Sequence, residues 1–291
     1  MSRSAQPSRL DDWVELTKPR ITVMVVVTAG IGILLASRSA PPWTLLLHAL
    51  LGTWLIAAGS AALNHVLERE ADGRMERTMQ RPLPTGRLTP WPAGVFGVVL
   101  AGLGGCELAF LVNGVTALLG LVAFVAYVAV YTPLKSRTGL ATLVGAIPGA
   151  IPPMMGWTAV TGRLDAGAWV LFGLLFLWQL PHFLAIAWMC REDYGRAGFP
   201  MLPVVHPDGR STARQMVLYS AALIPVSLGP SALGLTGVSY FIGALLLGVF
   251  FLAACLQFSR SISERAARRV LLASVAYLPG VLAVMVIDRV V

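Results

Sequence analysis

The sequence predicts an all-α integral membrane protein with nine transmembrane helices, its N-terminus inside the cell and its C-terminus outside. Three observations support this prediction: the composition, the spacing of the apolar segments and the distribution of the basic residues. Of the 291 residues, 56% are hydrophobic and only 12% are charged, which is about half the charged fraction of a water-soluble protein. Most of the surface must therefore face membrane lipid.

Nine apolar segments are long enough to cross a bilayer, which takes about 20 residues of helix. They cover approximately residues 21–37, 42–64, 91–112, 114–132, 139–160, 167–190, 215–235, 239–258 and 270–288. These segments form one domain over residues 21–291. Residues 1–20 are expected to form a cytoplasmic tail that ends in a short interfacial helix, because apolar and acidic residues alternate from Leu10 to Pro19.

The basic residues test this division independently. If the N-terminus is cytoplasmic, 19 of the 22 Lys and Arg residues fall on the cytoplasmic side, because only Arg38, Arg163 and Arg289 fall outside. Such an imbalance is typical of the positive-inside rule. The net charge of +8 therefore indicates topology, and no nucleic-acid partner is expected. We expect a multi-pass protein of the bacterial inner membrane with its polar loops in the cytoplasm.

The first polar loop, about residues 64–87, follows the second span. Asn64, Glu68 and Asp72 are spaced by four residues, so they share one face if the helix continues. A row of oxygen ligands suits a hard divalent cation such as Mg2+, and Arg77 and Arg81 could hold an anion with several phosphate oxygens. The alternative is a solvated mixed-charge loop with no function in binding.

The second polar loop, about residues 190–214, follows the sixth span. Glu192 and Asp193 are adjacent, so only one of them can point inward from a helix, and we expect it to be Asp193, with Arg196 beside it. A third polar segment places Lys135 and Arg137 where the fourth span meets the cytoplasm. Taken alone, that segment would be an ordinary positive-inside loop.

Four prolines interrupt two consecutive spans. Pro148, Pro152 and Pro153 lie in the fifth span and Pro181 lies in the sixth. Proline removes a backbone donor and kinks or breaks a helix, and broken helices in lipid usually line a cavity. The sequence therefore predicts a cavity beside these spans, the alternative being kinks that serve only helix packing.

Several motifs resemble those of a known family. The segment NHVLEREADGRMERTMQRPLP resembles the first acidic motif of the UbiA-type intramembrane prenyltransferases. Within that superfamily, four motifs resemble those of the protohaem IX farnesyltransferases, or haem O synthases. They are LTKPRIT (16–22), the Met-x-Arg-Thr-x-x-Arg-Pro pattern (75–82), YTPLK (131–135) and EDYGRAGFPMLPV (192–204). The resemblance covers most of the chain from residue 16 to residue 204.

This resemblance implies nine helices around a central cavity and a Mg2+-dependent reaction. A farnesyl group would pass from farnesyl diphosphate to a vinyl group of haem b, and water would add to give haem O. The implied catalytic and metal-binding residues are Asn64, Glu68, Asp72 and Asp193. The implied diphosphate-binding residues are Arg77, Arg81, Lys135, Arg137 and Arg196. The family usually has Asp where this chain has Glu68 and Glu70, which would shift each carboxylate by about 1 Å.

The acceptor site is expected near the cytoplasmic ends of the second and sixth spans. His65 and His182 lie there, and imidazole is a common ligand of haem iron. The resemblance favours His182 as that ligand, with Trp178 and Tyr131 as aromatic neighbours. The alternative for either histidine is a hydrogen bond within the bundle. A haem A synthase or a cytochrome oxidase assembly protein is a further partner that the resemblance suggests.

Two other functions compete with haem farnesylation. One is prenyl transfer to a different acceptor of the same superfamily, such as a 4-hydroxybenzoate or another quinone precursor. The other is transport, in which intramembrane acids and broken helices would form an ion path. Because most charges lie at the membrane edge, transport is the weakest of the three. Glu107 is isolated near the outer end of the third span and is not expected in the site.

Overall fold

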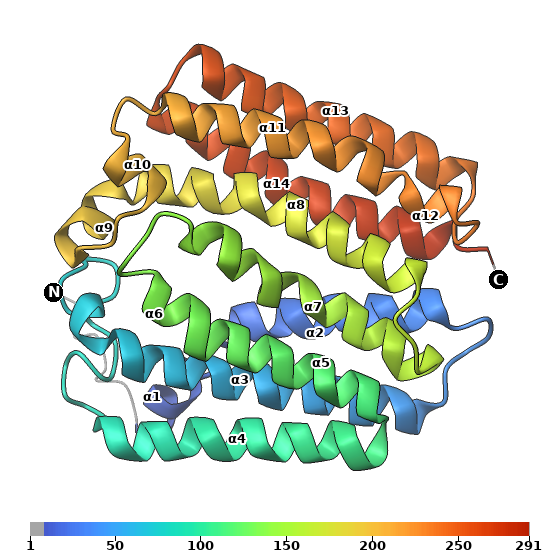
Figure 1. The fold of residues 1–291 in the computed structure, drawn as a ribbon, viewed down its shortest axis with the longest axis horizontal. Helices are drawn as coiled ribbons and strands as arrows, with labels where there is room; N and C mark the ends of the chain where they lie inside the picture. Colours follow the sequence, from blue (N-terminus) through green and yellow to red (C-terminus); the bar gives the residue numbers. More distant parts are fainter. Residues whose placement is uncertain (1–8, 291) are drawn as a thin grey trace, which may run out of the picture.

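The computed structural model describes residues 9–290, and in that range it is a bundle of helices with one isolated β-bridge, between Thr236 and Arg289 (Figure 1). Eight segments of this range are long and apolar enough to cross a membrane. They are α2 (Pro19–Ala36), α3 (Trp43–Asp72), α4 (Pro90–Leu111), the run Gly114–Leu134, α7 (Ala141–Thr161), α8 (Ala166–Met189), α13 (Val238–Arg260) and α14 (Glu264–Ile287). The protein is therefore a multi-pass membrane protein with eight candidate spans.

The seventh predicted span differs most from its prediction. The segment predicted as 215–235 forms α11 (Arg210–Ser227) and, after a break, the short helix α12 (Gly229–Ala232). Two arginines in the first turns of α11 make this helix much less apolar than its neighbours. It therefore does not count among the eight candidate spans, and nine membrane crossings remain a prediction.

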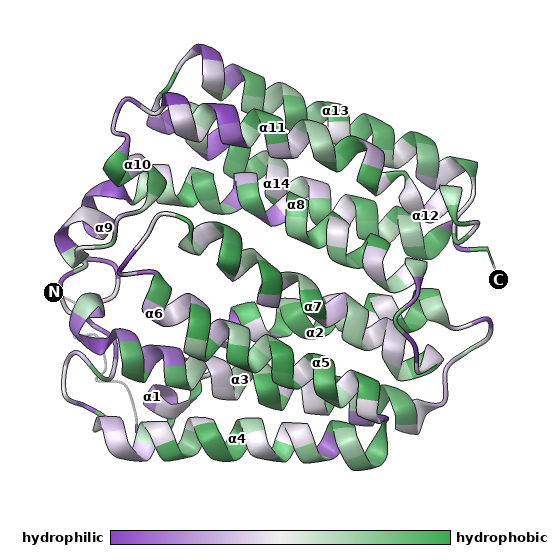
Figure 2. Cartoon of the chain, viewed as in Figure 1, coloured by the Kyte–Doolittle hydropathy of each residue, from purple (hydrophilic) through white to green (hydrophobic). Residues whose placement is uncertain are grey.

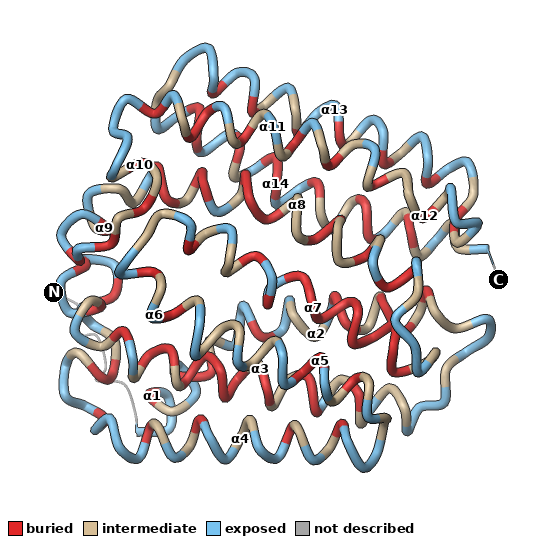
Figure 3. The backbone as a smooth tube through the Cα atoms, in the orientation of Figure 1, coloured by how far each residue is buried: buried red, intermediate tan, exposed pale blue. Residues whose placement is uncertain are grey.

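The helices differ in how deeply they are buried. In the most apolar 18-residue stretch of α7, 67% of the residues are buried, against 17% in the corresponding stretches of α4 and of the run Gly114–Leu134. Exposed Leu, Val and Phe side chains cover the outer faces of the bundle, and Figure 3 shows this exposed outer surface around a buried centre. A continuous apolar exterior suits lipid and not water. Helix α7 is therefore central, and α4 lies at the periphery.

The prolines do not interrupt their helices. Helix α7 continues through Pro148, Pro152 and Pro153, and α8 continues through Pro181. All four prolines are buried. Neither helix is broken at its prolines, because the neighbouring helices pack closely against these segments, and the cavity beside them remains a prediction. At Gly32 of α2, for example, a Cβ atom would collide with the backbone carbonyl of Pro153, as in other close packings of membrane helices.

One end of the bundle collects the polar segments. Helix α1 (Arg9–Leu16) forms where the interfacial helix is predicted, and Arg87 holds it there through a 2.9 Å hydrogen bond to the buried Asp12. Residues 1–8 of the predicted tail lie outside the described residues. Figure 2 shows hydrophilic residues gathered at this end, where α1, α9 (Arg191–Ala197), α10 (Leu202–Val205) and the start of α11 lie.

The two predicted polar loops contain more helix than expected. The first one begins as the last turns of α3, which runs without interruption to Asp72. The second one contains α9, α10 and the first turn of α11. The four-residue spacing of the first loop is thus a true helical face, as predicted.

Candidate active site

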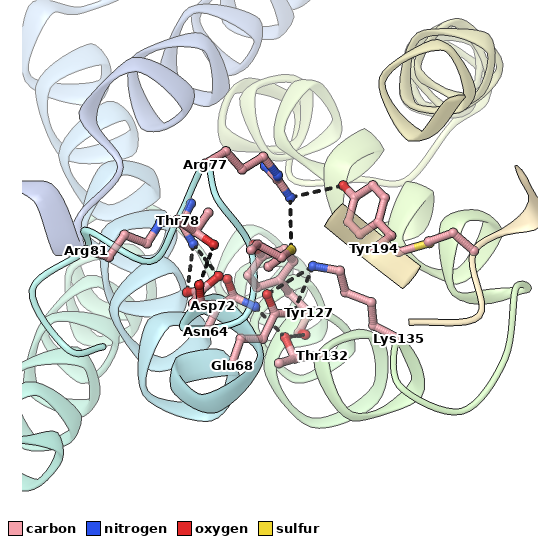
Figure 4. A network of polar contacts seen from close by, with 12 residues as sticks. Asn64, Glu68, Asp72, Arg77, Thr78, Arg81, Tyr127, Thr132, Lys135 and Tyr194 are labelled. Atoms are coloured by element: carbon pink, nitrogen blue, oxygen red, sulfur yellow. Dashed lines mark hydrogen bonds and ion pairs between the residues drawn. The ribbon is translucent and has the colours of Figure 1, made fainter. Parts of the chain in front are cut away.

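The first functional cluster is a row of three polar side chains on α3. Asn64, Glu68 and Asp72 are 2%, 6% and 1% exposed, although all three are polar or charged. Figure 4 shows them on one side of the helix, facing the segments that follow α3 and α5 (Gly114–Val125). Burial of a carboxylate is costly unless it is paired, and a buried amide also needs hydrogen-bond partners. Each of these three side chains therefore needs a partner.

The two carboxylates have basic partners. The Lys135 ammonium donates to both Glu68 oxygens, at 3.1 and 3.0 Å. The Arg81 guanidinium donates to both Asp72 oxygens, at 2.9 and 2.8 Å. Both ion pairs are largely shielded from solvent, because the carboxylate side chains are 6% and 1% exposed. Charge-assisted bonds of this kind are about twice as strong as neutral ones, so they fix both carboxylates.

The chain after α3 folds back to bring Arg81 to this position. The Thr78 hydroxyl donates to the backbone carbonyl of Asp72 at 2.9 Å. Met75 is fully buried under the same turn, against the cluster that contains Tyr194 and Phe199. A capped helix end and a buried side chain thus determine the path of residues 73–81.

The third polar side chain of the row, Asn64, also has a cationic partner. The Lys18 ammonium donates to Asn64 Oδ1 at 2.6 Å, and Asn64 Nδ2 donates to the Thr132 hydroxyl at 3.1 Å. Burial and the neighbouring Arg81 guanidinium lower the pKa of Lys18 to about 7. Lys18 is the one residue other than glycine with a positive φ, 48°, in the range 9–290. Strained backbone of this kind clusters at functional sites.

A π-helical turn presents the residues that face α3 from the fourth span. The segment η1 (Ala126–Tyr131) joins α5 to the short helix α6 (Thr132–Leu134), and the Thr132 hydroxyl donates to the Tyr127 carbonyl at 2.8 Å. Such π-turns are frequent at functional sites. The Tyr127 and Tyr131 rings lie 5.4 Å apart within it. The turn therefore positions Thr132, and one helical turn later Lys135, towards α3.

The second polar loop reaches the first through different contacts. Asp193 on α9 accepts hydrogen bonds from the Glu76 backbone amide, at 3.0 Å, and from Arg196. Partial burial opposes ionisation of Asp193, but these two hydrogen bonds outweigh it and lower the pKa of the carboxyl group. Glu192 is exposed. Asp193 therefore points towards the first loop, as expected. Its hydrogen-bond partners are the Glu76 amide and Arg196, and not the residues that pair with the carboxylates of α3.

Aromatic residues of the second loop contact the basic residues of the site. The Arg77 guanidinium lies over the Tyr194 ring at 5.1 Å and donates to its hydroxyl at 3.2 Å. The Lys135 ammonium lies 4.6 Å above the Phe199 ring. Cation–π contacts of this kind hold a charged side chain without neutralising it. Arg137, the remaining expected diphosphate ligand, is exposed at the end of the same segment.

The two histidines have different surroundings. His182 on α8 bonds through Nδ1 to the Ser274 hydroxyl of α14 at 2.7 Å and stacks on Trp178 at 5.1 Å. Trp178 Nε1 also donates to the Ser274 carbonyl, at 2.8 Å. His65 is 1% exposed, and neither of its ring nitrogens has a partner within the described range. No hydrogen bond or ion pair between residues 9 and 290 links either histidine to the three cation-paired residues of α3.

The side chains of the site offer few protein ligands for a metal ion. Within residues 9–290 no group of three or more His, Cys, Asp and Glu side chains is close enough to hold a metal ion. Mg2+, however, is usually bound by one or two carboxylates together with substrate phosphates and not by a protein cage. Glu68 and Asp72 supply hard oxygen atoms on one helical face, beside basic groups suited to phosphate. The residues therefore fit Mg2+ that is shared with a diphosphate.

Comparison with known sequences decides the family. A sequence model described as the UbiA prenyltransferase family matches residues 24–277. The chain belongs to the UbiA prenyltransferase family. This membership excludes the transporter alternative and agrees with the acidic and basic residues gathered at one end of the bundle.

Relatives within the UbiA family are similar along nearly the whole chain. A protein of Solibacter usitatus named "Protoheme IX farnesyltransferase" is 50% identical over 96% of this chain and 98% of its own. A protein of the same name from Koribacter versatilis is 46% identical over 99% of this chain and 96% of its own. The similarity thus includes both polar loops and also the last three long helices.

Solved structures share the UbiA fold at low sequence identity. A digeranylgeranylglyceryl phosphate synthase matches with a TM-score of 0.81 at 17% identity, over 96% of this chain and 98% of that one. A UbiA homologue from Archaeoglobus fulgidus, bound to GPP and Mg2+, matches with a TM-score of 0.66 at 16% identity, over 94% of this chain and 99% of that one. These similarities support the fold.

Three residues of the cluster were absent from the sequence-based site. Lys18 and Thr132 contact Asn64, and Tyr194 contacts Arg77. Lys18 could have been found, because it precedes Pro19 at the boundary of the first span, on the same side as the acidic residues. Thr132 and Tyr194 lie within the YTPLK and EDYGRAGFPMLPV motifs, but their contacts with Asn64 and Arg77 depend on the π-turn and on the docking of α9.

Proposed function

We propose that the protein transfers a farnesyl group from farnesyl diphosphate to a vinyl group of protohaem IX, with addition of water, to give haem O and diphosphate. The observation that carries this proposal is the similarity, at 46–50% identity over nearly full length, to relatives named "Protoheme IX farnesyltransferase". The motifs in both polar loops and the cluster at α3 support the same reaction.

The diphosphate is proposed to bind over the α3 row. Lys18, Arg81 and Lys135 each hold one oxygen-bearing side chain of α3 and carry donors suited to phosphate oxygens. Arg77 and Arg196, with Arg137 at the loop edge, extend this basic surface. When bound, Mg2+ supplies positive charge to the diphosphate leaving group. Asn64, Glu68, Asp72 and Asp193 are its proposed ligands.

The chain's own groups are proposed to assist ionisation of the allylic diphosphate. As the C–O bond breaks, its electron pair moves to the diphosphate oxygen, where Lys18, Arg81 and Lys135 stabilise the negative charge. The vinyl π-electrons of the acceptor then attack the allylic carbon. The resulting cation is discharged by addition of water and loss of a proton. No nucleophilic side chain is required.

The acceptor is proposed to lie beside the aromatic groups of α8 and η1. Stacking on Trp178 and the hydrogen bond to Ser274 hold the His182 ring in one orientation, which suits a ligand of haem iron. Tyr131 lies in η1, directly before Thr132, and is the proposed aromatic residue that would stabilise a prenyl cation. His65, which is fully enclosed, is the less favoured ligand.

We further propose nine membrane crossings around a central cavity, with α11 as the additional span, the N-terminus inside and the C-terminus outside. The distribution of Lys and Arg supports this orientation, which assigns the site and both polar loops to the cytoplasmic side of a bacterial inner membrane. A haem A synthase or an assembly protein of cytochrome oxidase would take up the product.

The deciding experiment is a prenyl-transfer assay on the purified full chain with farnesyl diphosphate and Mg2+. Haem b and 4-hydroxybenzoate are offered separately, and products are identified by mass. We expect a haem product that has gained one farnesyl group and one water. Formation of prenylated benzoate and not of a haem product would be consistent with the proposed diphosphate site but would refute haem b as the acceptor.

A further inference from the structure

A second site candidate lies away from the α3 cluster, between α11 and α13. A cleft of about 300 Å3 opens there, close to the loop that joins α13 to α14. Arg210, Arg214 and Val217 line it from α11, and Leu256 and Ser259 line it from α13. The cleft shares no residue with the proposed diphosphate site.

The cleft has a basic rim with little compensating acid. Arg210 and Arg214 are four residues apart, so they project from one face of α11. No ion pair within the described part of the chain involves Arg214, and the only ion-pair contact of Arg210 is a 3.9 Å approach to the exposed Asp208. Figure 2 shows this hydrophilic start of α11 beside the apolar body of the helix.

The walls of the cleft become apolar towards the middle of the bundle. Val217 lies one turn beyond Arg214 on the same face of α11, and Leu256 lies one turn before Ser259 on α13. Leu256 is 38% exposed, and further along the same two helices Leu218 and Val249 are also exposed. A basic rim at the end of the helices thus borders apolar cleft walls, which lie next to an exposed apolar surface of α11 and α13.

We propose that this cleft binds one anionic phospholipid. The guanidinium groups of Arg210 and Arg214 would hold the headgroup phosphate, and the groove at Val217 and Leu256 would hold the start of an acyl chain. Basic pockets between transmembrane helices are suited to anionic headgroups, and guanidinium groups bind phosphate with directional paired bonds. The apolar walls would contribute nothing to the binding of a free phosphate ion, whereas they would contact the acyl chain of a lipid. The cleft therefore favours a lipid.

The test measures lipid binding to the detergent-purified full chain by native mass spectrometry, with phosphatidylglycerol and phosphatidylcholine titrated separately. We expect one tightly bound phosphatidylglycerol and no comparable phosphatidylcholine. Arg210→Gln combined with Arg214→Gln should weaken phosphatidylglycerol binding about 25-fold, because each basic side chain strengthens the attraction of an anionic headgroup by about a factor of five. Arg9→Gln, which removes an exposed arginine of α1, is the matched control and should have no effect.

A second variant separates a shaped site from general charge attraction. Leu256→Trp fills the apolar wall and keeps every arginine, so it should also weaken phosphatidylglycerol binding. Equal binding of the two lipids would overturn the proposal, and so would unchanged binding in Leu256→Trp or an equal loss in Arg9→Gln. Displacement of the lipid by millimolar inorganic phosphate would instead indicate a site for free anions and would equally refute it.

Discussion

Replacing Lys135 by Met tests whether the ion pair with Glu68 is buried and paired as the structure shows. The two side chains are 10% and 6% exposed, and the ammonium bonds to both carboxylate oxygens. Removing one partner of a buried pair leaves an uncompensated charge and costs about 3–5 kcal/mol. Loss of the contact with the Phe199 ring, at 4.6 Å, adds about 0.5–2 kcal/mol. We therefore expect a destabilisation of roughly 3.5–7 kcal/mol from these two terms.

The double variant Lys135→Met with Glu68→Met is the control. It removes both charges, so no unpaired ion remains, and apolar replacement of a buried pair is often close to neutral. The free energy of unfolding is measured by titration with a denaturing detergent for the parent, both single variants and the double variant. The difference between the sum of the single effects and the double effect gives the coupling energy. A single-variant loss below about 1 kcal/mol, typical of surface pairs, would refute this reasoning.

Four further predictions concern activity and binding. Asp72→Ala should abolish Mg2+-dependent turnover while the protein remains in the membrane, as followed by assay and fractionation; retained turnover would contradict the proposed metal site. Lys18→Met should weaken farnesyl diphosphate binding about tenfold, the effect of one charge-assisted contact, and unchanged binding in calorimetry would remove Lys18 from the site. His182→Ala should weaken haem binding and spare diphosphate binding, and identical haem spectra would exclude this residue as a ligand. Glu107→Gln should leave turnover unchanged, because its partner His48 lies 16 residues before Asn64 on α3, roughly 24 Å along the axis.

The membrane environment of this protein was already evident from its composition. A chain with 12% charged residues has too few polar groups to cover a water-facing surface, so a membrane bundle follows from the sequence alone. Helical spacing likewise determined the α3 row. Residues four apart meet on one face whenever a helix persists, and α3 does persist to Asp72.

Tertiary structure decided the partners of those residues. Lys18 lies 46 residues before Asn64, and Lys135 lies 67 residues after Glu68, and no local pattern encodes which cation meets which oxygen. The same holds for α11, whose arginines make it more polar than the other long helices although it packs among them, and for the prolines that α7 tolerates.

The physical reason is the range of the interactions involved. Partitioning of apolar side chains into lipid and helical backbone hydrogen bonding act along a single segment, so the sequence by itself determines helices, a lipid-facing surface and the spacing of candidate ligands. Pairing of buried charges depends on close approach of distant segments, which is set by the packing of whole helices and by turns such as η1. The sequence therefore determined which chemical groups are available, and only the tertiary structure decided that three cations meet the three polar side chains of α3.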